Sequence, residues 1–353
     1  MSAPRVQFAT TADGFRIAYT ASGEGYPLIW LPHFLASHVQ LEWDFPQRYV
    51  YTTLGEHFRV VRLDNRGLGL SDRAADDISL PARILDLEAV AARIGCERFA
   101  LVGIEGGGNL AAAFAAAYPE RVSHLVFINW TPRFSEQTGV QRLSTLGLLM
   151  RRDWDMFTEN IGTSSFGYDT PLAAGYARLV RSTLTQDMAL RYGDELAAED
   201  LVSALERLQC ETLVLHSERN FYASEDSARL AAASAPGASM VTFPGALPDH
   251  IAAMLEAIVE FVAPPPPSAQ PAVDDTSVVE ATAFTGRELE ILVRLARGLS
   301  NREIADVLFL SPRTVERHLE NVYRKGGFRN RAEATAYAIT NRLVDGVRPG
   351  GPA

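Results

Sequence analysis

The chain has 353 residues, of which 47% are hydrophobic and 22% are charged, and its formal net charge is −10. This length allows two domains of ordinary size, and the composition excludes fibrous proteins and intrinsically disordered chains. The two cysteines, Cys96 and Cys210, form no C-x-x-C pair, which argues against a disulfide scaffold and against a cysteine metal site.

Targeting segments and metal motifs are equally absent from the sequence. Residues 1–11 lack the basic and apolar regions of a secretory signal, and no run approaches the roughly 18 apolar residues of a membrane helix. The seven histidines show no metal-ligand spacing. We therefore expect a cytoplasmic protein with no metal, no cofactor and no membrane partner.

The first 262 residues alternate short β-rich runs with helical patterns. The runs that predict strands are Tyr26–Leu31, Phe58–Asp64, Phe99–Gly103, His124–Trp130, Thr212–His216 and Met240–Phe243. Strands alternating with helices are typical of an α/β domain, a mostly parallel sheet with helices on both faces. Residues 131–208 break the alternation with a helical insert, which we expect to form a lid over the carboxyl-terminal edge of the sheet.

A boundary follows this α/β domain (1–262). Residues 263–282 include four consecutive prolines, which favour an extended spacer and predict an interdomain linker. Residues 1–282 carry 21 Lys+Arg and 35 Asp+Glu, a net charge of −14, whereas residues 283–345 carry 11 and 8, a net charge of +3. Residues 346–353 are rich in glycine and proline and are expected to form a disordered tail.

After the linker, the pattern becomes wholly helical. Helices are predicted at 286–297, 301–308 and 312–325, and the last two are joined by a tight connection, as in a helix-turn-helix. On the last helix Val315, Leu319 and Val322 share one face, so its polar side chains project away from the core. From periodicity alone, a solvated face explains these polar side chains better than a binding surface does.

A resemblance changes that interpretation. Residues 284–325 read F-T-G-R-E-L-E-I-L-V-R-L-A-R-G-L-S-N-R-E-I-A-D-V-L-F-L-S-P-R-T-V-E-R-H-L-E-N-V-Y-R-K, and this run resembles the LuxR-type (GerE-type) DNA-binding domain. The resemblance implies a homodimer on a two-fold-symmetric site in double-stranded DNA, with a helix at about 331–343 often forming the dimer contact. The positions that it assigns to base edges are Glu316, Arg317 and Glu320, and those assigned to phosphates or to the same exposed face are Arg313, Thr314, Asn321, Arg324 and Lys325.

The preceding part, residues 6–262, resembles the α/β-hydrolase fold. The similar fragments include L-D-N-R-G-L-G-L-S-D-R at 63–73, P-H-F at 32–34 and V-G-I-E-G-G-G at 102–108. Hydrolases of this fold carry a nucleophile at the centre of G-x-S-x-G, on a strained turn between strand and helix, and that centre is Glu105 here. The position of the triad acid is Asn220, which cannot neutralise an imidazolium, and the histidine is His250, with two extra residues before it. We therefore expect no hydrolase activity.

Three roles for Glu105 remain open. As a nucleophile it would resemble the dehalogenases and epoxide hydrolases of this fold, which use an aspartate usually followed by Trp, whereas Gly106 follows here. As a structural residue it would close the vacant site with an ion pair to His250 or an arginine. As a ligand-binding group it would lie in a cleft beside the helix N-terminus at Gly106 and meet a cationic or hydroxylated molecule. A buried carboxylate without a partner has a raised pKa, so some partner is expected.

These observations predict a DNA-binding transcriptional regulator whose inactive hydrolase-like domain senses a small molecule. The candidate ligand-binding residues are Phe34, Glu105, Gly106, Asn220 and His250. The lidded pocket of this fold supports that prediction by analogy alone. Two alternatives stay open: an active enzyme that uses Glu105 and His250 and is fused to a DNA-binding domain, or a scaffold for dimerisation and partner binding.

Overall fold

The computed structural model forms two compact units, residues 1–265 and 266–353, and each is described by itself. The described residues are 3–133, 139–166, 170–220, 222–262, 286–296, 299, 301, 304–305, 312–326, 328, 334–335 and 337–338. The predicted linker and tail lie outside them, as does most of the predicted helices at 301–308 and 331–343. Side chains are described from residue 146 onward in the helix that begins at 139.

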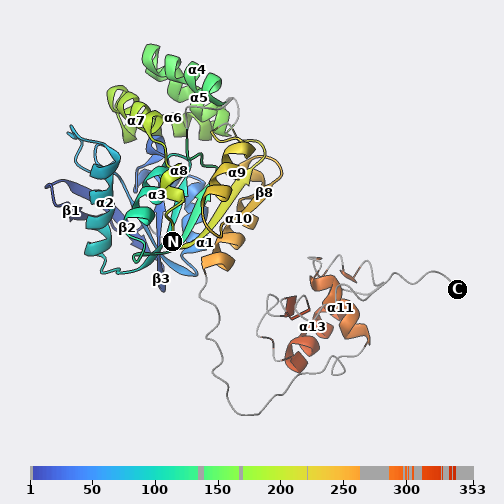
Figure 1. Cartoon of the computed structure of the whole chain (residues 1–353). Helices are drawn as coiled ribbons and strands as arrows, with labels where there is room; N and C mark the ends of the chain where they lie inside the picture. The colour runs from blue at the N-terminus through green and yellow to red at the C-terminus, as the bar shows by residue number, and fades with distance from the viewer. Residues whose placement is uncertain are drawn as a thin grey trace. The chain divides into compact units, whose positions relative to one another are not determined.

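The first unit is built on an eight-stranded sheet in the order β1-β2-β4-β3-β5-β6-β7-β8 (Figure 1). Its strands are β1 (Gln7–Thr10), β2 (Arg16–Ser22), β3 (Tyr26–Leu31), β4 (Phe58–Leu63), β5 (Phe99–Ile104), β6 (Val122–Ile128), β7 (Glu211–Ser217) and β8 (Ser239–Phe243). Strands β1 and β2 are antiparallel to their neighbours, and the other six are parallel. The six predicted strands are confirmed, with ends that shift by at most two residues, and the sequence missed β1 and β2.

Helices cover both faces of this sheet, which explains why the central strands are apolar on both sides. In β5, Phe99 and Leu101 pack on one face, and Ala100 and Val102 pack on the other. One face is covered by α2 (Leu80–Arg93), α3 (Gly107–Ala117), α8 (Val202–Leu205) and α9 (Glu225–Ser234), and the other by α1 (Gln47–Leu54) and α10 (Leu247–Val262). The predicted α/β fold class is confirmed.

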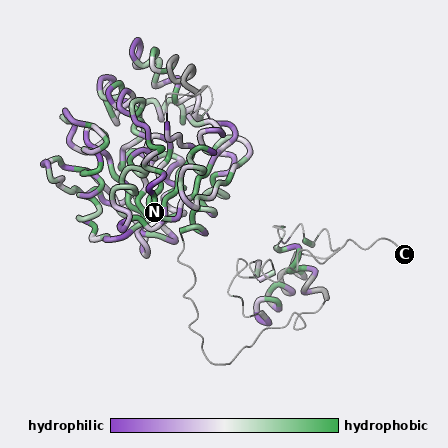
Figure 2. The backbone as a smooth tube through the Cα atoms, viewed as in Figure 1, coloured by the Kyte–Doolittle hydropathy of each residue, from purple (hydrophilic) through white to green (hydrophobic). Residues whose placement is uncertain are grey.

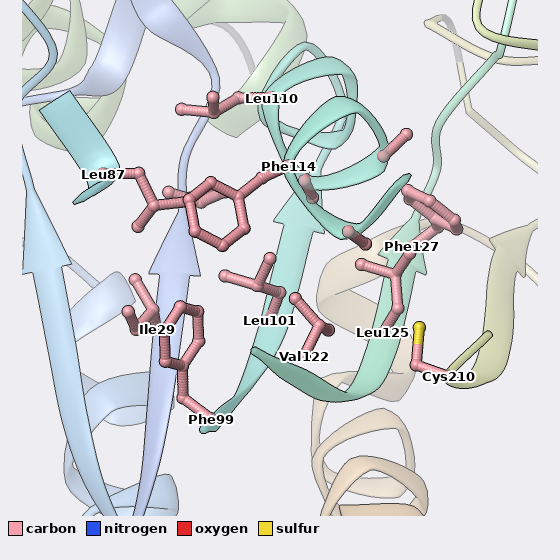
Figure 3. Packing of buried hydrophobic residues seen from close by; sticks show 14 of the residues in the cluster. Ile29, Leu87, Phe99, Leu101, Leu110, Phe114, Val122, Leu125, Phe127 and Cys210 are labelled. Carbon is pink, nitrogen blue, oxygen red and sulfur yellow. The ribbon is translucent and has the colours of Figure 1, made fainter. Parts of the chain in front are cut away.

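Helix α3 supplies much of the first core cluster. Its residues Leu110 and Phe114 point toward Leu87, Leu101 and Phe99, and all five side chains are fully buried or nearly so (Figure 3). Figure 2 shows that hydrophobic residues concentrate in the interior of the first unit, among the strands. This packing fixes α3 rigidly against β5, and the turn that joins these two elements is therefore fixed as well.

The described part of the segment between β6 and β7 is helical, in agreement with the helical insert predicted at 131–208. It contains α4 (Gly139–Arg152), α5 (Trp154–Phe166), α6 (Pro171–Thr183) and α7 (Gln186–Ala198), the four lid helices, which lie together above one end of the sheet (Figure 1). The lid helices take part in a separate apolar cluster, which includes Phe157, Val180 and Tyr192. The Tyr192 hydroxyl donates a hydrogen bond to the carbonyl of Arg66 at 2.7 Å, which ties the lid to the sheet domain.

The second unit contains α11 (Gly286–Ala296) and α13 (Pro312–Gly326). Val315, Leu319 and Val322 are buried, which confirms the predicted apolar face of the last helix. They pack with residues of α11 and with Ala334 and Ala338. Across both units, no described helix is long and apolar enough to span a membrane.

Candidate functional site

The turn between β5 and α3 holds Glu105 in an unusual backbone conformation. Its φ is +49°, a left-handed value that is uncommon for a residue with a side chain. The Glu105 N–H donates to the carbonyl of Ile128 at 2.9 Å, and its own carbonyl accepts from the N–H of Gly108 at 2.9 Å. Holding a non-glycine residue in this backbone conformation costs about 1–3 kcal/mol of folding free energy. Residues strained in this way cluster at active sites and ligand-binding sites.

The glycines after Glu105 are required by close packing. A Cβ atom on Gly107 would overlap the carbonyl of Leu31 at the end of β3, and one on Gly103 would lie 2.6 Å from the α-carbon of Gly108. The start of α3 therefore presses against the carboxyl ends of β3 and β5. This is the sharp strand-to-helix turn that the resemblance assigned to the nucleophile, and Glu105 occupies its tip.

A cavity of about 740 Å³ lies next to this turn, between the sheet and the lid helices. Its volume falls in the range of sites that hold small organic ligands. The residues that line it are His33, Phe34, Leu35, Glu105, Leu146, Gly147, Leu148, Met150, Arg151, Phe157, Ile161, Ser165, Tyr176, Leu190, Gly193, Asp194, Leu196, Ala197 and Tyr222. Most of the wall is apolar, and most of it comes from the lid.

Glu105 presents its carboxyl group to this cavity. Burial raises its pKa from 4.5 to about 7. Among the described residues, no side-chain hydrogen bond or ion pair to this carboxyl is found, so no opposite charge lowers its pKa again. Near neutral pH the group is therefore divided between the protonated form, which donates a hydrogen bond, and the ionised form, which only accepts.

His33 stands beside Glu105 on the loop that follows β3. Burial lowers its pKa to about 3, so the imidazole is uncharged at neutral pH. Its Nδ1 accepts a hydrogen bond from the N–H of Leu35 at 3.2 Å. We assign the proton of the neutral ring to Nε2 from this bond. The ring packs against Phe34 and Tyr222, with centroid distances of 4.3 and 5.2 Å.

The lid is joined to the helix that carries this turn by a buried polar chain. The Trp130 indole N–H donates to Asn109 Oδ1 at 2.7 Å, and Asn109 Nδ2 donates to Glu199 Oε2 at 2.7 Å. Glu199 follows α7 and pairs with the buried Arg83 of α2. A displacement of α7, which lines the cavity, therefore strains hydrogen bonds on α3.

The opposite end of the site, after β7 and β8, contains His250 and Asn220. His250 Nε2 lies 2.9 Å from Ser217 Oγ, its Nδ1 lies 3.2 Å from the carbonyl of Pro244, and its ring stacks on Phe243. Asn220 Oδ1 accepts from the backbone N–H groups of residues 222 and 223, at 2.7 and 2.8 Å. Asn220 is thus bound within its own loop, whereas His250 bridges the end of β7 at Ser217 and the loop after β8 at Pro244.

Among the described residues, no ion pair joins Glu105 to His250 or to an arginine, and His250 is hydrogen-bonded to Ser217 and Pro244 instead. Asn220 and His250 are not among the residues that line the cavity, and their assignment as ligand-binding residues stays a prediction. Phe34 and Glu105 do line it, and Gly106 adjoins it.

Sequence reasoning missed His33, Tyr176 and Tyr222 as cavity residues. A Cβ atom on Gly106 would lie 3.2 Å from His33 Cδ2 and 3.0 Å from Tyr222 Oη, so these two side chains converge on the same turn. Burial and the charge of Glu105 both raise the pKa of Tyr176. The positions of His33 and Tyr222 after parallel strands were a usable signal, because ligands of open α/β sheets bind at the carboxyl ends of strands.

Helix α13 of the second unit carries the residues that the sequence assigned to DNA contacts. Lys325 Nζ donates to the buried Glu288 carboxylate at 2.6 Å, which joins α13 to α11, and Arg324 donates to Asn321 Oδ1 at 2.7 Å. Thr314 is half-buried and Arg324 is exposed. The side chains of Arg313, Glu316, Arg317 and Glu320 lie outside the described part of the chain. Lys325 thus has a structural partner that the sequence did not predict.

Comparison with known proteins agrees with the geometry of the first unit. The family model described as alpha/beta hydrolase fold matches residues 27–249. The chain belongs to the alpha/beta hydrolase fold family. A hydrolase of Pseudomonas aeruginosa PA01 superposes on this hydrolase-fold domain with a TM-score of 0.64 at 21% identity, covering 74% of this chain and all of that one. Epoxide hydrolase 4 of Mus musculus is 33% identical over 121 residues, which are 33% of this chain and 32% of that protein.

The C-terminal part matches a second family. The model described as bacterial regulatory proteins, luxR family, covers residues 282–338, so the hydrolase-fold domain is followed by a luxR-type DNA-binding domain. The uncharacterized transcriptional regulatory protein YxjL of Bacillus subtilis is 42% identical over 64 residues, which are 18% of this chain and 29% of that protein. The chain spans about a third of the length of these curated relatives.

Proposed function

We propose that this chain is a transcriptional regulator in which the hydrolase-fold domain binds a small molecule and thereby changes DNA binding by the luxR-type domain. One observation carries the proposal. The tip of the strand-to-helix turn presents a carboxyl group to a cavity of about 740 Å³, while the histidine and the asparagine at the triad positions are bonded elsewhere.

The same contacts argue against serine-hydrolase chemistry. A triad needs a histidine within hydrogen-bond reach of the nucleophile and an acid that holds the histidine. His250 Nε2 faces Ser217, and Asn220 accepts only backbone hydrogen bonds. Ser217 itself is fully buried and lies outside the cavity lining, so it offers no substitute nucleophile. We infer a domain that keeps the binding volume of a hydrolase and has lost the reaction.

The DNA side of the proposal follows the luxR-type domain. We propose that Arg313, Thr314, Glu316, Arg317, Glu320, Asn321, Arg324 and Lys325 form the contact surface of α13 and that the chain binds its operator as a homodimer. A ligand shifts such an equilibrium only through a difference in its affinity for the DNA-bound and free forms. Ligand and operator must therefore alter each other's affinity by the same factor.

The decisive experiment is selection of sheared DNA from the source organism with the full-length chain, with and without a small-molecule extract of the same cells. We expect enrichment of a two-fold-symmetric site, altered at least several-fold by the extract. Arg317→Ala should lose the site, and Arg207→Ala, an exposed arginine of the hydrolase-fold domain, should keep it. Enrichment that the extract never alters would refute sensing, and no enrichment under either condition would refute the regulator.

A second candidate function is an active enzyme that uses Glu105 as its nucleophile. It is favoured by the carboxyl group at the tip of the turn and by the similarity to epoxide hydrolase 4. Turnover of a p-nitrophenyl ester, an epoxide or a haloalkane that disappears in Glu105→Gln would establish it. Inertness toward all three classes of compound is what we expect, because the acceptor nitrogen of His33, the described histidine at the cavity, is already bonded to the N–H of Leu35 and cannot take a proton from water.

A further inference from the structure

We propose that the cavity binds an uncharged, apolar molecule through a carbonyl-type oxygen that accepts hydrogen bonds from the Glu105 carboxyl and from Nε2–H of His33. The inference rests on the proposed function, since it names the class of ligand that the same cavity would take. It assigns to Glu105 the role of hydrogen-bond donor, in place of a nucleophile or an anionic partner.

The walls of the cavity determine the body of the ligand. Phe34, Met150, Phe157, Ile161, Leu190 and Leu196 line it with aromatic and aliphatic surface. A molecule that covers this surface gains roughly 25 cal/mol for each Å² of apolar area removed from water. The described charged groups other than Glu105 that line the cavity are Arg151 and Asp194, which form an exposed ion pair with each other at 2.7 Å.

Donors gather at the inner end, around the turn that bears Glu105. His33 turns the Cδ2 side of its ring toward Gly106, and Nε2 is the neighbouring ring atom. Because Nδ1 is occupied by the N–H of Leu35, the ring offers a donor and no second acceptor. The positive end of the α3 dipole also lies here. A ligand oxygen with free lone pairs matches this set.

The titratable groups around Glu105 disfavour a charged head group. They are His33 from the loop after β3, Tyr176 from α6 and Tyr222 from the loop after β7. All three are uncharged at neutral pH, since burial lowers the pKa of His33 and raises those of both tyrosines. A cationic ligand would face the N–H of His33 and the positive end of α3. Among the described residues, an anionic ligand would find no free cation at this end, because the nearby Arg83 is paired with Glu199.

Protonation of Glu105 then controls binding. The acid form donates a hydrogen bond to the ligand oxygen, whereas the carboxylate repels it. With a pKa of about 7, affinity for a carbonyl ligand should fall about tenfold between pH 6 and pH 8 if only the acid form binds. Glutamine at this position keeps an N–H donor and does not titrate, so Glu105→Gln should bind equally at both pH values.

Three compounds that share a heptyl chain test the head group: 2-nonanone, octylamine and sodium octanoate. Their affinities for the full-length chain are measured by titration calorimetry at pH 6 and pH 8. We expect 2-nonanone to bind most tightly at pH 6 and about tenfold more weakly at pH 8. His33→Phe should weaken its binding about fivefold at both pH values, the effect of one lost neutral hydrogen bond. His57→Phe makes the same substitution at an exposed histidine outside the cavity and should change nothing.

Other outcomes overturn the inference in distinguishable ways. Octylamine that binds most tightly, and more tightly as pH rises, would make Glu105 an anionic partner for a cation. Octanoate that binds most tightly would point to an anion site. If no compound binds while the cell extract still alters DNA selection, the assigned ligand class is wrong and the sensor function survives. If neither the compounds nor the extract has any effect, both proposals fall.

Discussion

The two ends of the hydrolase-fold site are built from the same kind of element, the loop after a parallel strand, yet their polar groups are used differently. At the β5 end, Glu105 and His33 face a cavity, and the carboxyl has no partner among the described residues. At the β7 and β8 end, Asn220 is hydrogen-bonded within its own loop, and His250 is hydrogen-bonded to Ser217 and to the carbonyl of Pro244. One end is open to a ligand, and the other has been closed by internal hydrogen bonds.

This difference is the basis of our proposal that the domain keeps the fold and the cavity of a hydrolase without the reaction. Catalysis by a triad requires both ends to meet at one reacting atom. In the proposed sensor the closed end supplies no base to that atom, while the cavity can still hold a ligand. An unpartnered buried carboxyl costs stability, so its retention at the open end needs a compensating use. Ligand binding is the use that the surrounding donors and apolar walls support.

The largest expected effect concerns the scaffold of the open end. In Gly107→Ala, the new Cβ atom overlaps the carbonyl of Leu31, and backbone atoms cannot rotate away as a side chain can. We expect a loss of about 3 kcal/mol or more in the free energy of unfolding, measured by urea denaturation. Gly147→Ala on α4 is the matched control, since a Cβ atom there meets nothing within 4 Å. Equal effects of the two substitutions would show that the turn is not packed against β3.

A smaller effect is expected from the carboxyl at the open end. The pKa of Glu105 is about 7 in the folded chain against an ordinary value of 4.5, so the folded chain keeps a proton that the unfolded chain releases between these values. Stability therefore falls as pH rises from 4.5 to 7 and stays lowered above pH 7. Glu105→Gln should be more stable than the natural chain by about 2 kcal/mol at pH 8, after allowance for water in the cavity.

The control is the same pair of proteins at pH 4.5, where both side chains are uncharged in the folded state and the gain should fall to about 0.5 kcal/mol or less. Denaturant midpoints at several pH values measure it. A gain that does not change with pH would mean that the glutamine packs better and that Glu105 is not forced into an apolar environment.

The contrast between the two ends also shows how far sequence reasoning reaches. Five of the six predicted strands, all but the edge strand β8, are runs of mostly buried residues, whereas β1 is only four residues long with one buried position. Phe34 and Glu105 were found because they follow strands within recognisable fragments. The lid wall was not predictable, since Leu190 and Leu196 carry ordinary helical periodicity and face a cavity only after the lid folds over the sheet.

The hydrogen bonds of Asn220 and His250 could not be predicted from the sequence, for a different reason. Sequence gives the order of residues along loops, and it does not give the side-chain rotamers. His250 stands after β8 as a hydrolase histidine would, but its backbone is non-helical at the start of α10, with φ −136° and ψ 18°. Its ring stacks on Phe243 and reaches Ser217. The orientation of the His250 side chain thus depends on its contacts with Phe243 and Ser217, which a sequence motif does not specify.

Removal of His250 tests whether the closed end is only structural. His250→Ala deletes the contacts with Ser217 Oγ and the Pro244 carbonyl and should cost about 1–2 kcal/mol of unfolding free energy, as net hydrogen bonds of this kind do. Affinity for 2-nonanone should stay unchanged at pH 6. A strong loss of affinity without loss of stability would place His250 at the ligand and erase the contrast between the two ends.

The smallest change in the free energy of unfolding is expected for Asn220→Asp, which restores an acid at the position of the triad acid. In Asn220→Asp, the carboxylate can still accept both backbone hydrogen bonds of its loop, and hydrogen bonds to a charged acceptor are at least as strong as those to an amide. Stability should change by less than about 0.5 kcal/mol. Hydrolysis of a p-nitrophenyl ester should stay at background even in Glu105→Ser/Asn220→Asp, because His250 remains bonded to Ser217 and no base reaches the new hydroxyl. Turnover in the double variant that is abolished by His250→Ala would mean that the closed end reopens readily, and that the domain has lost its reaction through two side chains alone.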